Sequence, residues 1–473
     1  MVESFARQKR DPATKSDMRN HAPAVLGLLG IVSSALFLLI LRMGSFRAQL
    51  LRFEYLFFII FAVYLLAVLL ILGVDSPRKS SFFIIIFFAL VFRLILLLSV
   101  PDFSDDIMRY VWDGRVQAAG INPYLYAPTA PQLSFLRDSA IYPRINYPNL
   151  PTIYPPIAQL FFALVYRLGA NSLVFMKTVI VILDMIAVFL IARLLNVLKI
   201  SPLRSIIYAW NPLVILEFAH SGHIDVLAVL FLVAAVLALL RRRPGASGFF
   251  LALATLAKFY PALLLPLFFK KRDFKMPVSF VSTVILGYMP FIGAGTKMLG
   301  SLGTYFRDWE FNGGLWHFAS MGLGYLGMPI RKAILLRYLF IFVFIVASAL
   351  VALRKKKSPR GFLTGVYLVI GLYILLARCL FPWYVIWLIP FLCVQPSPGW
   401  LLFSGALVLS YFAANPKPGP SYEVLRYVEY IPLYFLLALE MLMPKLKQFR
   451  SKRAGLLKFG RSQIAGMECD GYR

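Results

Sequence analysis

Long apolar runs recur along the chain and set the first limit on what it can fold into. Many contain about 18 or more residues, the length that an α-helix needs to cross a hydrocarbon layer of ~30 Å. The composition agrees, because 60% of the 473 residues are hydrophobic, 15% are charged and the mean hydropathy is +0.76. The sequence therefore predicts an all-α polytopic integral membrane protein rather than a set of soluble domains.

The formal net charge of +28 is distributed in a way that argues against nucleic-acid binding. Basic residues gather in the two tails and in short connections, as the positive-inside rule describes for cytoplasmic segments. These groups are Arg7, Lys9 and Arg10, Arg241–Arg243, Lys270–Arg272, Arg354–Lys357, and Lys445–Arg461. We expect a multi-pass protein of the cell (plasma) membrane with both termini cytoplasmic.

Apolar runs at both ends of the chain support one continuous transmembrane domain, residues 22–443, between basic cytoplasmic tails at 1–21 and 444–473. The first run, 22–41, is too long for a signal-peptide core and is expected to be retained. The other expected spans lie near 53–73, 81–100, 276–292, 331–353, 362–377, 383–395, 399–413 and 430–443. Counting spans from either end places loops 101–154 and 293–330 on the outer face.

The middle of the chain leaves two topologies open. Its apolar runs are 155–169, 173–198, 203–221, 223–240 and 248–269. If all five cross, the bundle has 14 spans and six basic residues fall outside, against the charge rule. If 155–169 and 248–269 are half-membrane or hairpin segments, the bundle has about 12 spans and His220, His223 and Asp225 approach the outer loop. We favour the second topology, since Pro261 and Pro266 suit a broken element lining a cavity.

The outer loop 101–154 opens with an acidic stretch. Ser104 suits a helix N-cap, and Asp105 and Asp106 suit the positive end of a helix. Apolar residues recur along one face as far as Ala118, which predicts an amphipathic helix lying along the outer interface. Neighbouring helical side chains diverge by about 100°, so the two aspartates are expected to differ in role. One can accept a proton from an acceptor hydroxyl, while the other orients that hydroxyl, holds a sugar hydroxyl or helps to bind a cation. The alternative is that both belong to an acidic helix cap with a solvated face.

Tyr- and Pro-rich segments follow this stretch and provide rigid, hydrogen-bonding surface for carbohydrate. Short motifs recur in order from about residue 81 to 395: Asp105-Asp106, Tyr110–Arg115, Asn122–Tyr124, Tyr154–Pro156, Trp210–Leu213, Gly222–Asp225, Lys258–Pro261, and Pro382–Tyr384 with Trp387 and Pro390. Together they resemble the GT-C class of polyprenyl-phosphate-sugar-dependent glycosyltransferases, most closely its bacterial and archaeal α-mannosyltransferase branch. The resemblance implies a GT-C-like fold and inverting transfer of a hexose, with mannose expected, from a polyprenyl-phosphate donor. An acidic residue of the first loop would be the base.

Candidate site residues follow from charge, position and this resemblance. Asp105 and Asp106 are the candidate catalytic residues. Arg378 and Lys258 are candidate phosphate partners, because a guanidinium or a lysine inside an apolar run can stabilise a leaving phosphate; the alternative for Arg378 is a snorkelling side chain. The full set expected to contact substrate is Arg109, Tyr110, Asp113, Asn122, Tyr124, Tyr154, His223, Asp225, Lys258, Glu310, Asn312, Arg378, Trp383 and Tyr384.

No metal site is assigned, because His220, His223 and Asp225 are too generic a set to define one. A divalent cation, Mg or Mn, would be sought at Asp105 and Asp106. The expected partners are a polyprenyl-phosphate-linked sugar donor, a lipid-linked or glycan acceptor and membrane lipids, with no nucleic acid. The main alternative function is a transporter or flippase of lipid-linked sugars without catalysis.

Overall fold

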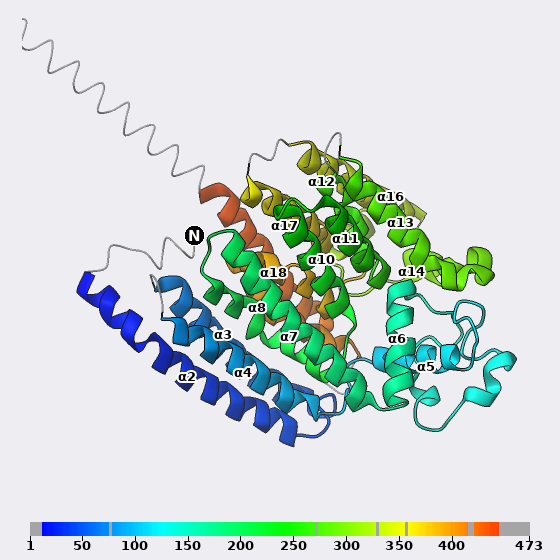
Figure 1. Ribbon diagram of the computed structural model, residues 1–473, viewed down its shortest axis with the longest axis horizontal. Coiled ribbons are helices and arrows are strands. Elements are labelled where there is room, and N and C mark those ends of the chain that lie inside the picture. Colours follow the sequence, from blue (N-terminus) through cyan, green and yellow to red (C-terminus); the bar gives the residue numbers. More distant parts are fainter. Residues whose placement is uncertain are drawn as a thin grey trace, which may run out of the picture.

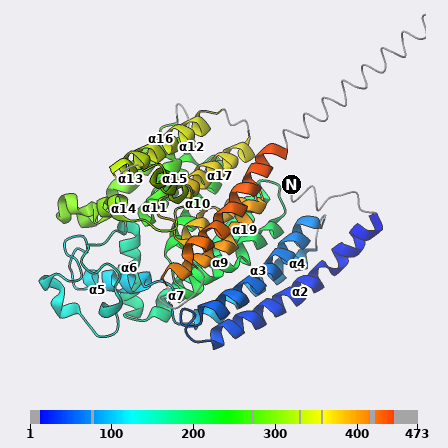
Figure 2. The ribbon, with the colours of Figure 1, turned by 180° about the vertical axis from the view of Figure 1, so that it is seen from behind.

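The computed structural model describes residues 12–74, 78–269, 273–327, 331–354, 358–414 and 421–443. Within these ranges the chain is helical apart from turns and loops, with isolated bridges joining Phe311 and Asn312 to Cys379. Most helices run lengthwise through one bundle, and the loop-rich part that carries α5 and α6 lies at one end (Figures 1 and 2). Residues 1–11 and 444–473, which hold most of both expected tails, lie outside the described ranges.

Seven helices in the described part are long and apolar enough to cross a membrane. They include α2 (Pro12–Arg42), α3 (Leu50–Gly73), α4 (Lys79–Leu97), α7 (Leu173–Val197), α16 (Arg331–Leu353) and α17 (Pro359–Leu376), while the seventh joins α13 (Lys275–Tyr288), η6 (Met289–Leu299) and α14 (Leu302–Asp308). The all-α membrane architecture expected from the sequence is therefore confirmed. A further helix over residues 422–443 lies along the bundle surface (Figure 2).

Several expected spans are assembled from short pieces. The run near 383–395 consists of η7 (Pro382–Trp387) and α18 (Ile389–Leu392), because prolines interrupt the backbone hydrogen bonding of a continuous helix. The run near 399–413 consists of α19 (Pro398–Ala406) and η8 (Leu407–Ala414). The run near 203–221 contains η3 (Pro202–Ser205), α8 (Ile206–Ala209), α9 (Pro212–Ile215) and the π-helical η4 (Leu216–His220).

Two apolar segments in the middle of the chain form short helices. α6 (Pro156–Gly169) and α11 (Pro244–Ala257) each contain 14 residues, or roughly 21 Å at 1.5 Å per residue, less than a hydrocarbon layer. α11 packs against α10 (Asp225–Leu240) and ends where Lys258 adopts an extended conformation. The chain then turns back through η5 (Tyr260–Leu264) and α12 (Leu265–Phe268) to pack against α16 and α17. This turn places Lys258 at the tip of the hairpin.

The acidic stretch forms α5 (Asp106–Ala118), but this helix does not lie with one face in the headgroups. Its residues from Ile107 to Val116 are all buried, polar face included. α6 packs so closely against it that a β-carbon at Gly114 would lie 2.5 Å from the Phe162 carbonyl oxygen. The polar side chains are buried because remote segments satisfy them, and periodicity within the helix does not reveal those partners.

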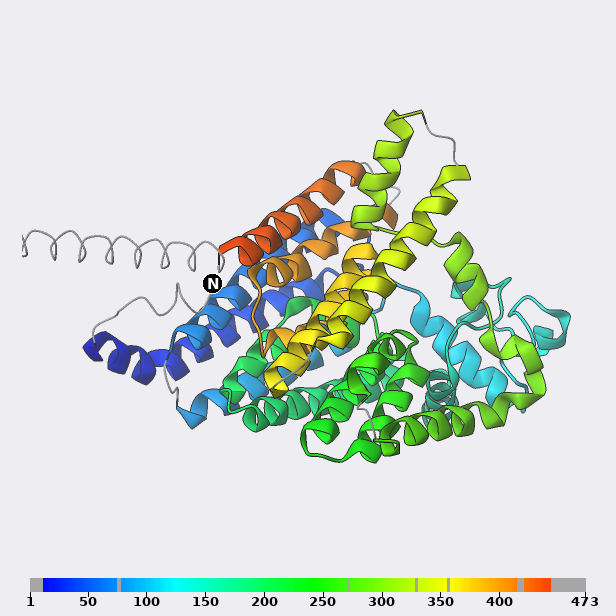
Figure 3. The ribbon, with the colours of Figure 1, turned by 90° about the horizontal axis from the view of Figure 1, so that it is seen from above.

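Charged side chains inside the bundle pair with one another or with backbone carbonyls. Arg93 of α4 donates to Asp184 of α7 at 2.5 Å, and both side chains are fully buried. Lys177 donates to the backbone carbonyl of Ser99 at 2.6 Å rather than pairing with Asp184. The first contact joins α4 to α7, and the second joins α7 to the segment between α4 and loop 101–154. The loop region and the start of α2 lie at opposite ends of the molecule (Figure 3).

Candidate active site

A cavity of about 1060 Å³ lies where loops 101–154 and 293–330 meet the Lys258 turn, the 376–387 segment and α16. Its wall includes Asp106, Arg109, Lys258 and Arg378, together with aromatic rings and the apolar side chains of α16. Acidic, basic and apolar groups from five separated segments thus face one space. Concave sites with a few convergent polar groups in an apolar lining are typical of ligand sites.

The two neighbouring aspartates point to different surroundings. Asp106 lines the cavity, and its Oδ1 accepts a hydrogen bond from Asn146 Nδ2 at 2.5 Å. Asp105 is absent from the described cavity wall; its Oδ1 accepts from Arg144 Nη2 at 2.9 Å, and both side chains are more than a third exposed. The expected divergence of the pair is observed. The Ser104 hydroxyl accepts from the Asp106 N–H at 3.2 Å and so caps the helix one residue before its N-cap position.

A buried polar chain lies directly behind Asp106. His223 Nδ1 is 3.7 Å from Asp106 Oδ2, and His223 Nε2 is 3.2 Å from Glu217 Oε2. The imidazole is fully buried and stacks on the cavity-lining Trp383 with centroids 3.8 Å apart. Glu217 also accepts a hydrogen bond from the hydroxyl of Tyr411, which lines the cavity. His223, expected to contact substrate, therefore stands behind Asp106.

Lys258 is a cationic residue of the cavity wall. Its Nζ lies 3.3 Å from Asp225 Oδ2, while Asp225 Oδ1 accepts from the indole N–H of Trp387 at 2.8 Å. The ammonium also lies over the rings of Tyr154 and Tyr384, at 5.5 and 5.7 Å from their centroids. Asp225 is fully buried, whereas 15% of the Lys258 side chain stays exposed. Asp225 thus orients the lysine, and the lysine faces the cavity.

Arg378 provides a second cationic group on the wall. Its guanidinium donates to Glu310 Oε2 and to the Arg307 carbonyl, each at 3.0 Å, and lies 5.2 Å from the ring centroid of Trp316. Arg337 of α16 also lines the cavity and donates to the same carbonyl at 2.9 Å. Trp316 is 4% exposed and lines the same cavity.

Five further candidate residues lie outside the described cavity wall: Tyr110, Asp113, Asn122, Tyr124 and Asn312. Asp113 accepts from Arg109 and from Gln159, each at 2.9 Å, while Tyr110 stacks on Phe162. The Tyr124 hydroxyl donates to the Tyr154 carbonyl at 2.8 Å, and Asn122 donates to the Phe291 carbonyl at 3.0 Å. Asn312 donates to Glu429 at 2.8 Å. Asp113 and Tyr124 thereby hold two residues of the wall, Arg109 and Tyr154.

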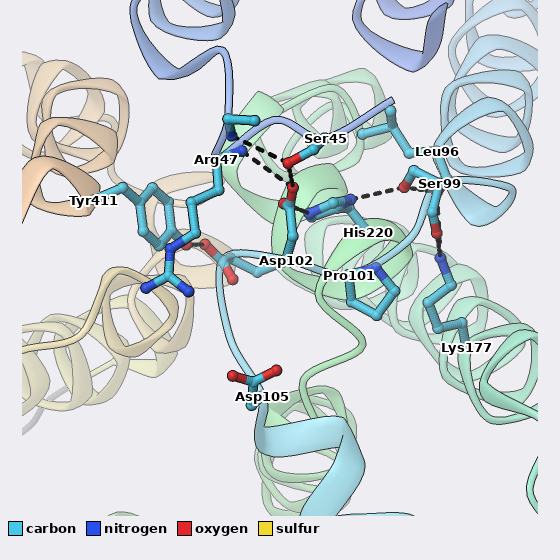
Figure 4. A network of polar contacts seen from close by, with 12 residues as sticks. Ser45, Arg47, Leu96, Ser99, Pro101, Asp102, Asp105, Lys177, His220 and Tyr411 are labelled. Atoms are coloured by element: carbon cyan, nitrogen blue, oxygen red, sulfur yellow. Dashed lines mark hydrogen bonds and ion pairs between the residues drawn. The ribbon is translucent and has the colours of Figure 1, made fainter. Parts of the chain in front are cut away.

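Arg47 lines the cavity although the sequence reasoning did not select it. It belongs to the short connection between α2 and α3, which is held in place by Asp102: Asp102 Oδ2 accepts from Ser45 Oγ at 2.8 Å and from the Arg47 N–H at 3.1 Å (Figure 4). Burial raises the pKa of Asp102, but the adjacent His220 ring and hydrogen bonds from the Arg47 N–H and the Ser45 hydroxyl outweigh it and lower the pKa. Asp102 is therefore a charged tether at neutral pH.

The tether continues inward through His220. His220 Nε2 lies 3.2 Å from Asp102 Oδ1, and its Nδ1 lies 2.7 Å from Ser99 Oγ (Figure 4). The position of Arg47 in the predicted membrane topology is the feature that could have identified it from the sequence. In the predicted orientation its loop faces outward, where an arginine runs against the positive-inside rule.

The candidate histidines and aspartates do not form a metal centre. His220, His223 and Asp225 belong to three separate contact sets, and Asp105 and Asp106 face different partners. In the described part of the chain, no three His, Cys, Asp or Glu side chains gather in an arrangement that could hold a metal ion. Asp105 and Asp106 pair with Arg144 and Asn146 respectively, so their carboxylates face different neighbours.

Residues 33–270 match the family model described as alpha-(1->6)-mannopyranosyltransferase, N-terminal domain. The matched segment is half of the chain and includes Asp106, His223 and Lys258. The chain belongs to this family. The resemblance to the mannosyltransferase branch is thereby confirmed, and family membership supports glycosyltransferase activity for the protein. None of the curated proteins compared with it matches the chain. Arg378 and the second outer loop lie beyond the segment matched to this mannosyltransferase family.

Proposed function

We propose that the protein transfers mannose from a polyprenyl-phosphate donor to a glycan or lipid-linked acceptor, with inversion at the anomeric carbon. The observation that carries the proposal is the make-up of the cavity. One carboxylate, Asp106, faces the same space as several cationic side chains, among them Lys258 and Arg378, and as an apolar wall. These are the groups needed to deprotonate an acceptor, hold a phosphate and accommodate a lipid.

The apolar wall supports a lipid-linked donor. Ile341 and Ile345 of α16 line the cavity, yet they are 46% and 59% exposed in the isolated chain. Side chains that both line a cavity and face outward on a membrane helix give a lateral opening to hydrocarbon. A polyprenyl chain could remain in the membrane while its phosphate reaches the polar wall. A water-soluble nucleotide sugar would have no use for such an opening.

Lys258 and Arg378 would hold the donor phosphate. As the glycosidic bond breaks, the leaving phosphate oxygen takes the bonding electron pair and gains negative charge. Preorganised cations in a site shielded from water stabilise developing charge of this kind. Asp225 and Glu310 keep the two cations oriented at 3.3 and 3.0 Å. Both pairings can loosen as the cations turn toward the donor phosphate, a diester with one negative charge that gains a second as the glycosidic bond breaks.

Asp106 would act as the general base. It would remove the proton from the acceptor hydroxyl as that oxygen attacks the anomeric carbon, so the proton ends on Asp106 and the new glycosidic bond replaces the bond to phosphate. Asn146 fixes one carboxylate oxygen, and His223 and Glu217 stand behind the other. Attack from the face opposite the phosphate accounts for inversion.

The charge pattern supports catalysis at the non-cytoplasmic face of the plasma membrane, with both termini inside. Arg241–Arg243 follow the end of α10, whose first residue, Asp225, contacts the Lys258 of the cavity wall. The 16 residues of α10 separate this basic cluster from the site by roughly 24 Å at 1.5 Å per residue.

Proteoliposomes containing the purified protein separate an enzyme from a transporter or flippase. Mannose transfer and lipid translocation would be measured in the same vesicles, using a polyprenyl-phosphate mannose labelled in the sugar. We expect transfer to require Asp106 and to form a mannosylated product. Translocation without product, unchanged in Asp106→Asn, would instead indicate a flippase, and a scaffold would show neither activity.

A further inference from the structure

Two aromatic rings from different outer loops meet at the cavity. Tyr147 of the first loop and Trp309 of the second have ring centroids 4.2 Å apart and an interplanar angle of 30°. Both residues line the cavity, and 51% of Tyr147 is exposed. Tyr305 packs against Trp309 with centroids 5.1 Å apart. The pair therefore presents an open, supported aromatic face beside the catalytic space.

The backbone at Tyr147 is strained. Its φ is +47°, a left-handed conformation that is unfavourable for a bulky side chain and that also departs from the extended conformation preferred before Pro148. Strain of this kind persists only where surrounding contacts enforce it, and it clusters at ligand sites.

Contacts on both sides enforce the conformation. Asn146 donates to Asp106, and the Leu150 N–H donates to the Tyr147 carbonyl at 3.0 Å. Arg109 of the cavity wall donates to the Leu150 carbonyl at 3.1 Å. The strained residue is thus locked to α5, and the residue immediately before it holds the proposed base. The position of the Tyr147 ring and the position of the Asp106 carboxylate are coupled through one peptide unit.

We propose that Tyr147 and Trp309 form a binding platform for a sugar ring of the acceptor. This inference rests on the proposed glycosyl transfer and specifies its acceptor as a glycan rather than a bare alcohol or lipid hydroxyl. A pyranose has an apolar face of C–H groups that packs on an aromatic ring, while its hydroxyls reach polar neighbours. On this platform a sugar hydroxyl can approach Asp106, whose orientation Asn146 maintains.

Acceptor kinetics with the full-length protein in nanodiscs test the platform. Octyl α-mannoside is the glycan probe, octanol is the bare-alcohol probe, and polyprenyl-phosphate mannose is the donor. We expect Tyr147→Ala and Trp309→Ala to raise the KM for octyl mannoside about tenfold while leaving the donor KM unchanged. Tyr147→Phe, which keeps the ring, should remain within about twofold of the wild type.

Two matched variants separate the ring from the strain and from general effects on the loop. Tyr147→Gly removes the ring and relieves the left-handed strain, so it should behave like Tyr147→Ala if the ring binds the sugar. Phe135→Ala removes an aromatic ring that is 70% exposed in the same loop, outside the described cavity wall, and should leave acceptor KM unchanged. Wild-type KM in Tyr147→Ala and Trp309→Ala, or equal use of octanol and octyl mannoside, would overturn the platform.

Calorimetric titration of octyl mannoside distinguishes failure of the platform from failure of the proposed function. Binding that weakens about tenfold in Tyr147→Ala and Trp309→Ala supports the platform even if the donor proves to be of another class. Unchanged binding in both variants contradicts it. Release of free mannose from the donor, measured without acceptor, reports donor use independently of the platform residues.

Discussion

Replacing Asp106 by Asn would remove the proposed proton acceptor with little change in shape. In the wild type, Asn146 donates a hydrogen bond to Asp106 at 2.5 Å, and the amide oxygen of the new side chain can still accept it. The substitution leaves the cationic residues of the wall, Lys258 and Arg378, unchanged. A positioned general base contributes typically 10²–10⁴-fold to a rate. We therefore expect kcat to fall by about 10²–10⁴, or about 2.7–5.4 kcal/mol at 1.36 kcal/mol per tenfold, with donor binding retained.

Asp105→Asn is the matched control because it makes the same chemical change one residue away. Asp105 pairs with Arg144 at 2.9 Å, but the two side chains are 37% and 38% exposed. Exposed ion pairs typically contribute about 0.2–1 kcal/mol, so this variant should keep activity within about fivefold. The assay is initial-rate transfer of radiolabelled mannose from the lipid donor, with donor binding measured separately. Equal losses in the two variants, or a larger loss in Asp105→Asn, would refute the assignment.

Three further predictions follow from charged residues. Arg93→Leu leaves Asp184 buried without its partner and should lower the free energy of unfolding by about 3–5 kcal/mol, measured by denaturation in detergent. Burial raises the pKa of Asp138, but its contacts lower the pKa to about 2, so its stabilisation of the first loop should persist above about pH 4 and disappear toward pH 2, measured by pepsin cleavage. Lys258→Met and Arg378→Met should each raise donor KM by about tenfold or more, measured in transfer assays.

Each prediction has an internal control. Arg93→Leu combined with Asp184→Leu should recover part of the lost stability, and no recovery would contradict a pairing role. Asp138→Asn should make the loop cleavable already at pH 4, and a wild-type cleavage profile would contradict the titration. Lys258→Met leaves the buried Asp225 carboxylate without its ammonium partner, which should lower the stability of the protein. Adding Asp225→Asn removes that unpaired charge, so the double variant should recover stability yet keep the high donor KM.

The long spans could be predicted because length and composition are local properties. α3, α4, α7 and α17 lie close to their expected positions. The broken elements were harder, because apolar content alone does not distinguish a span from a set of short helices. Pro212 and Pro390 carried the signal for the breaks that separate α8 from α9 and that interrupt 382–392.

The helix at the acidic loop was predictable, but its surroundings were not. Periodicity indicated α5 and a start near Ser104. It could not show that Gln159 and Leu150 supply partners for Asp113 and Arg109, because those contacts join residues about 40 positions apart. The sequence therefore predicted that the polar face of α5 meets lipid headgroups, whereas in the structure it packs against other parts of the protein.

Part of the candidate site could be predicted from the sequence. The chemistry of carboxylates and cations selected Asp106, Lys258 and Arg378, all of which line the cavity. Composition and spacing could not decide between Asp105 and Asp106, since only the fold determines which side chain faces inward. Arg47 lies in the short connection between α2 and α3 and Asn146 in the long loop 101–154, both without motif character, and their roles depend on tertiary placement.

The most direct test of the account is donor use by the purified wild-type protein. Radiolabelled polyprenyl-phosphate mannose and GDP-mannose would be supplied separately, with octyl mannoside as acceptor, and product formation measured. The account predicts mannosylated product from the lipid donor and none from the nucleotide donor. Product from GDP-mannose, or no product and no free mannose from the lipid donor, would contradict it.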